Sequence, residues 1–173
     1  MKRNLIVALA ALAVLVAVTS VPASGGPGED VEGMINRAVA VFTDHPPAAK
    51  SAGAALADIL DASLLILPAT PYASQYRTLV GTAKREFQET SLFTQKAHTD
   101  LAAAYRLVAA GEEWKFPEAS IRPRDEGRGI DRARVYCQAE IDSALREFRA
   151  GQRESAVGHL VSFVLLVITP IER

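Results

Sequence analysis

The chain has 173 residues, of which 49% are apolar, 23% charged and 6% aromatic, with one cysteine and a formal net charge of −1. This balance excludes an intrinsically disordered chain, a collagen-like repeat and a small disulfide-rich protein, because each of these requires a more extreme composition. The near-neutral charge also argues against nucleic acid as a partner, since binding to phosphates requires an excess of Lys and Arg.

The first 23 residues have the three-part layout of a secretory signal peptide. Lys2 and Arg3 precede an apolar run of 14 residues from Leu5 to Val18, and small residues follow up to a cleavage site after Ala23. We therefore expect export to the periplasm or the extracellular space. The alternative is an uncleaved N-terminal membrane anchor, for which the apolar run lies at the short end of the ~17 to 25 residues required. Cleavage would remove two positive charges and change the net charge from −1 to −3.

The mature chain is predicted to be all-α. Proline is absent from 72–116 and from 124–169, and these long intervals allow uninterrupted helices. No run of Val, Ile or Thr alternates with polar residues over the length of a strand. We expect a flexible mature N-terminus at 24–29 and a single domain at 30–173, consistent with the usual domain size. The expected helices cover about 30–43, 47–67, 71–110, 130–151 and 152–169.

The expected helix at 71–110 carries a seven-residue repeat of mostly apolar positions, which is typical of a helix packed against a partner helix. Two series offset by four residues make up the repeat: Tyr76, Ala83, Thr90, Ala97 and Ala104, and Val80, Phe87, Thr94, Leu101 and Val108. Its centre is polar, so either one helix continues to Ala110 or it breaks near Thr90-Ser91, where an N-cap is available. The fold predicted is thus an antiparallel bundle of five, possibly six, helices.

The last helix has almost no polar face. Leu160 to Ile168 is nearly all apolar, but it is too short to span a membrane, so we expect no transmembrane span in the mature chain. A helix that is apolar all round is buried centrally or faces a partner. Central burial is the simpler interpretation; the alternatives are a homodimer contact or a groove for an apolar ligand or peptide.

A long loop is expected at 112–129, where prolines and glycines interrupt any helical period. Aromatic residues beside arginines are enriched at binding hot spots, so the loop is a candidate partner-binding site. Its candidate residues are Trp114, Phe116, Arg122, Arg124 and Arg128. The alternative is that the two aromatic residues attach the loop to the helices while the charged residues face water.

Catalytic and metal-binding motifs are not found in the sequence. No Glu lies three residues before a His as in di-metal bundles, and there is neither a nucleophile elbow nor a glycine-rich phosphate loop. We therefore predict no cofactor, no metal and no catalytic residue. A haem or copper site using His98, His159 or Met34 remains an alternative. Cys137 could be a nucleophile, a metal ligand or an intermolecular bridge, but its position on an apolar helical face favours a place in the core.

The leading functional prediction is a non-catalytic exported helical protein that binds or scaffolds an unknown protein or another component of the cell envelope. One alternative is a carrier of an apolar ligand or haem inside the bundle. The residues expected in the core, or lining such a ligand, are Phe87, Phe148, Phe163 and Leu166. A second alternative is an enzyme without a recognisable motif.

Overall fold

The computed structural model describes residues 27–43, 49–89, 94–116 and 129–169, and its regular structure in these ranges is helical throughout. This confirms the all-α prediction, and the predicted signal peptide lies outside the described residues. Six helices follow one another in these ranges: α1 (Pro27–Thr43), α2 (Ala49–Ile66), α3 (Ala73–Glu89), α4 (Gln95–Val108), α5 (Gly129–Arg149) and α6 (Arg153–Ile168). Within the described ranges, no helix is both long enough and apolar enough to cross a membrane.

Most helices begin and end within two residues of the predicted positions, and the start of α1 differs by three residues. α1 begins at Pro27 rather than at residue 30, so it takes up part of the stretch expected to be flexible. Proline suits the first position of a helix, because its φ is already helical and the missing N–H would have no partner there. α5 ends at Arg149, and Gly151 then adopts a φ of 77° in the short turn that leads into α6.

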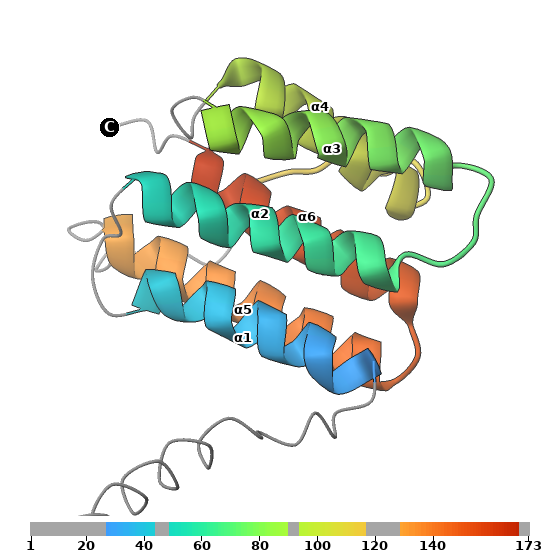
Figure 1. Cartoon of the computed structure of the whole chain (residues 1–173), viewed down its shortest axis with the longest axis horizontal. Coiled ribbons are helices and arrows are strands. Elements are labelled where there is room, and N and C mark those ends of the chain that lie inside the picture. The colour runs from blue at the N-terminus through green and yellow to red at the C-terminus, as the bar shows by residue number, and fades with distance from the viewer. Residues whose placement is uncertain (1–26, 44–48, 90–93, 117–128, 170–173) are drawn as a thin grey trace, which may run out of the picture.

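The helices form three layers of two (Figure 1). α2 and α6 lie side by side in the middle layer, with α1 and α5 on one side and α3 and α4 on the other. A helix in a middle layer is covered on opposite faces, so it must be apolar around most of its circumference. α6 meets this condition, since 11 of its 16 residues are buried. The prediction of a centrally buried last helix is therefore confirmed.

The core is formed by the apolar faces that the helical spacing indicated. Side chains from all six helices contribute to one continuous cluster. Tyr76 of α3 is fully buried there and keeps its hydroxyl satisfied, donating to Ser63 Oγ of α2 at 2.8 Å. Ser63 in turn donates to the carbonyl oxygen of Leu60 at 2.7 Å. This chain of hydrogen bonds lets a polar atom lie in the core without the cost of an unsatisfied group.

The region 71–110 forms two helices, so of the two arrangements that the sequence left open the structure shows the broken one rather than one continuous helix. α3 ends at Glu89 and α4 begins at Gln95, and the two helices pack against each other. The N-cap of α4 is Thr94, whose Oγ1 accepts a hydrogen bond from the N–H of Ala97 at 3.1 Å. The predicted break at Thr90-Ser91 lies outside the described residues.

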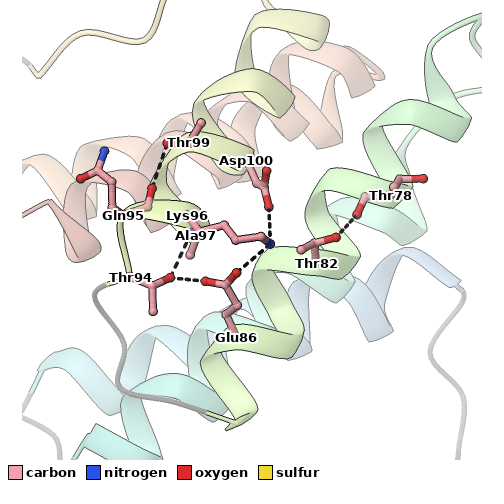
Figure 2. A network of polar contacts seen from close by, with 9 residues as sticks. All are labelled: Thr78, Thr82, Glu86, Thr94, Gln95, Lys96, Ala97, Thr99 and Asp100. Atoms are coloured by element: carbon pink, nitrogen blue, oxygen red, sulfur yellow. Dashed lines mark hydrogen bonds and ion pairs between the residues drawn. The ribbon is translucent and has the colours of Figure 1, made fainter.

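Polar contacts tie the start of α4 back to α3 (Figure 2). The hydroxyl of Thr94 donates to a carboxylate oxygen of Glu86, and Lys96 Nζ lies 2.8 Å from the other oxygen of that carboxylate. Lys96 also approaches Asp100 at 3.3 Å. The seven-residue pattern is compatible with this hairpin, because both helices turn the same kind of apolar face toward α2 and α6.

Candidate functional site

The backbone after α4 turns by means of two residues with positive φ. Ala110 has a φ of 52° and Gly111 a φ of 90°, and the N–H of Gly111 donates to the carbonyl of Arg106 at 2.9 Å. Glycine accepts this conformation readily, and the hydrogen bonds satisfy carbonyls at the helix end. The sequence predicted helix as far as Ala110. α4 ends earlier, at Val108, and Ala110 and Gly111 belong to the turn.

This turn brings Trp114, the only tryptophan of the chain, onto α6 and α4. Its Nε1–H donates to Ser162 Oγ of α6 at 3.0 Å. Its ring meets His98 of α4 edge to face, with ring centres 5.9 Å apart. The indole is half-buried, and Ser162 is 7% exposed. Trp114 therefore fixes the first part of the predicted 112–129 loop on the surface of two helices, as the attachment interpretation predicted.

Of the five residues predicted to bind a partner, the structure brings together the two aromatic ones. Phe116 is half-buried, and its ring packs edge to face against Trp114 with centres 6.3 Å apart. Lys115 between them is exposed. Arg122, Arg124 and Arg128 lie outside the described residues. We call Trp114, Phe116 and His98 the aromatic anchor.

The four residues predicted for the core or for a ligand belong to the interior of the fold. Phe87 of α3 and Phe163 and Leu166 of α6 are buried in the core cluster, and Phe148 of α5 is half-buried against that cluster. The ring of Phe163 contacts that of Phe42 edge to face, with ring centres 5.9 Å apart. The buried side chains of α6 lie against α2, α4 and α5 of the same chain. The homodimer contact through this helix stays a prediction.

Cys137 lies on the inner side of α5 and is 9% exposed, which confirms its predicted place in the core. Burial, together with the negative charge of Glu140, raises the pKa of its thiol to about 12. The thiolate is the reactive form of cysteine, so this thiol is poorly suited to nucleophilic chemistry at neutral pH.

A polar cluster that the sequence analysis did not predict joins α5 to α6. The two ring nitrogens of His159 face two carboxylates of α5: Nδ1 lies 2.5 Å from Glu140 Oε2, and Nε2 lies 3.3 Å from Glu147 Oε1. The hydrogen bond to Glu140, aided by the charges of both glutamates, raises the pKa of the imidazole above its usual value. Burial of the ring works in the opposite direction.

The sequence carried a faint signal for this cluster. Glu140 and Glu147 lie seven residues apart and thus on one face of α5, and His159 stands among apolar residues of α6. His159 entered the sequence analysis only as a candidate haem or copper ligand. Both of its nitrogens face carboxylates instead, and no group of three or more His, Cys, Asp and Glu in the described part of the chain is arranged to hold a metal ion.

Comparisons with known proteins were made at three levels. No family model matches the sequence, and neither the search of curated proteins nor that of solved structures finds a match.

Proposed function

We propose that the mature chain is a non-catalytic exported helical protein, folded as an antiparallel bundle, that binds a macromolecular partner in the cell envelope. The binding region would be the segment that begins at the aromatic anchor and continues through the arginines at 122, 124 and 128. The observation that carries the proposal is the hydrogen bond from Trp114 to Ser162, which attaches this segment to α6.

Attachment at Trp114 would favour binding of a partner, because a partner that orders a free segment must overcome the loss of its conformational entropy. A segment whose first residues are held in one place loses less freedom when a partner binds. The anchor also leaves aromatic surface within reach of a partner, since Trp114 and Phe116 are half-buried rather than buried and Lys115 beside them is exposed. Aromatic and arginine side chains are the types most often found at the energetic centre of interfaces.

The proposal includes removal of residues 1–23 during export. The mass of the protein purified from the envelope of its own cells tests this part directly. We expect a chain that begins at Ser24. A full-length chain held in the membrane fraction would contradict cleavage and favour the membrane anchor.

Binding is tested with a photo-crosslinking residue placed at position 124 in living cells, compared with one placed at the exposed Arg85 of α3. We expect position 124 to give a crosslinked product of one defined mass and position 85 to give none. Replacement of Arg122 and Arg128 by Ala should reduce this product. The matched control replaces Arg77 of α3 and Arg153 of α6, which are both exposed.

The proposal fails if positions 124 and 85 give the same products, or if the two pairs of arginine substitutions have equal effects. Circular dichroism of every variant separates loss of binding from loss of fold. Since none of the substituted arginines lies in the described core, we expect each variant to keep its helical content.

A further inference from the structure

His159 of α6 is enclosed by two glutamates of α5, and this geometry points to a function beyond packing. We propose that Glu140, Glu147 and His159 form a pH-dependent clasp between α5 and α6. The clasp holds while the imidazole carries two protons, and it weakens when the imidazole becomes neutral. The proposal is independent of partner binding, because it concerns how one pair of helices is held together.

The two contacts require the charged form of the ring. A neutral imidazole has one N–H and can donate to one carboxylate, whereas an imidazolium has two and can donate to both. Here each nitrogen faces a different carboxylate, at 2.5 Å for Glu140 and 3.3 Å for Glu147. Loss of one proton therefore removes one of the two donors as well as the positive charge that the glutamates share.

The partial burial of the three side chains makes the loss of this proton unfavourable for the contact between α5 and α6. The side chains of Glu140, Glu147 and His159 are 23%, 17% and 31% exposed, so water can replace the lost contacts only in part. Glu147 Oε2 is buried and has no hydrogen-bond partner among the described residues. A half-buried carboxylate without a counter-charge destabilises the helix contact that carries it.

The titratable groups described below on the neighbouring helices α4 and α2 do not supply a positive charge in place of the imidazolium of His159. On α4, burial raises the pKa of the Tyr105 phenol, and the negative charges of Glu140 and Glu112 raise it further. On α2, Asp58 is exposed and Asp61 is bound to Lys84 of α3 at 2.6 Å. Among the described residues, the charges that act on His159 are those of the two glutamates.

The direction of the pH effect follows from linkage. The pKa of His159 is raised in the folded chain, so the folded state binds this proton more tightly than the unfolded state does. The extra stability is complete below the unfolded pKa of about 6.5 and disappears as the pH rises through the folded pKa. Glutamates in general stay ionised throughout this range, so the imidazole is the group whose charge changes.

The test measures the imidazole and the folding equilibrium separately, on the whole mature chain. NMR of the imidazole carbons between pH 5 and 9 gives the folded pKa of His159, which is assigned by its absence from His159→Gln. Urea unfolding at the same pH values gives the folding equilibrium constant. We expect the pKa to lie above that of an unfolded histidine. For each unit of difference, the equilibrium constant should fall about tenfold from the acidic to the alkaline end, relative to His159→Gln.

Variants distinguish a clasp from a merely structural role. Glu140→Gln should lower the imidazole pKa and flatten the pH dependence of stability, and Glu147→Gln should do the same to a smaller extent because its contact is longer. The matched control is Glu113→Gln, which breaks an exposed pair with Arg106 and should leave both curves unchanged. If a glutamate variant does not fold, the titration of the unmodified chain still decides. A folded pKa at or below the unfolded value, or a pH dependence equal to that of His159→Gln, would overturn the proposal.

Discussion

The hydrogen bond between Trp114 and Ser162 attaches residues 112–116 to α6, and a double-mutant cycle measures its strength. Trp114→Phe keeps an aromatic ring and removes the donor, and Ser162→Ala removes the acceptor. The double substitution removes both. In a folded protein a neutral hydrogen bond of this kind contributes about 0.5 to 1.5 kcal/mol.

The single substitution at Ser162 underestimates this contribution. Ala has the higher helix propensity, by up to about 0.5 kcal/mol over Ser inside a helix such as α6. The loss of about 1 kcal/mol from the hydrogen bond is therefore partly offset, and we expect Ser162→Ala to cost only about 0.5 kcal/mol. The difference in helix propensity between Ser and Ala is the same whether residue 114 is Trp or Phe, so it cancels in the cycle. The cycle should therefore give a coupling free energy of about 1 kcal/mol.

The assay is urea unfolding of the four proteins followed by circular dichroism at 222 nm, because Trp114→Phe removes the fluorophore. The free energies of unfolding can be compared only if they fall with urea concentration at the same slope in all four proteins. A coupling free energy below about 0.3 kcal/mol, which is within the usual error of additivity, would refute the attachment of the segment through this bond.

Two further predictions concern the α3–α4 hairpin and the core thiol. Thr94→Ala removes the N-cap of α4 and should lower the free energy of unfolding by about 1 kcal/mol, whereas Thr99→Ala, on an exposed turn of the same helix, should be neutral or slightly stabilising in the same urea titration. Equal losses would show that Thr94 is not the cap. Cys137, with a thiol pKa raised to about 12 by burial and by Glu140, should react with a disulfide reagent at pH 8 slowly in the native protein and rapidly in urea. Rapid stoichiometric labelling of the native protein would contradict its burial.

Most of the fold could be predicted because it depends on local patterns. The spacing of Tyr76, Val80 and Phe87 indicated which face of α3 is buried, and the structure confirms it. Whether the helix breaks between α3 and α4 stayed open, since a seven-residue repeat has the same spacing in one continuous helix as in two helices of a hairpin. The cap residue Thr94 also donates a hydrogen bond to Glu86 of α3, a contact that exists only once the two helices are packed.

For the candidate sites, the sequence indicated single residues, and the structure showed their partners. Residue types pointed to Trp114 as a notable side chain, but Ser162, which receives its hydrogen bond, lies 48 residues further along the chain. The clasp is similar, because Glu140 and His159 belong to two helices and meet only when these helices pack. The spacing of residues within one segment cannot predict a contact between residues of two different helices.

By itself, the sequence determined that this protein is helical, that α6 is buried at its centre and that Cys137 lies in the core. These properties follow from where the apolar residues lie around each helix, on one face of α5 and on nearly all faces of α6, and burial of apolar surface drives folding. The tertiary structure alone decided that the region 71–110 forms a hairpin, that Trp114 is held on α6 and that His159 lies between two glutamates. These properties depend on the distance between side chains from different helices, and that distance is set by packing rather than by order along the chain.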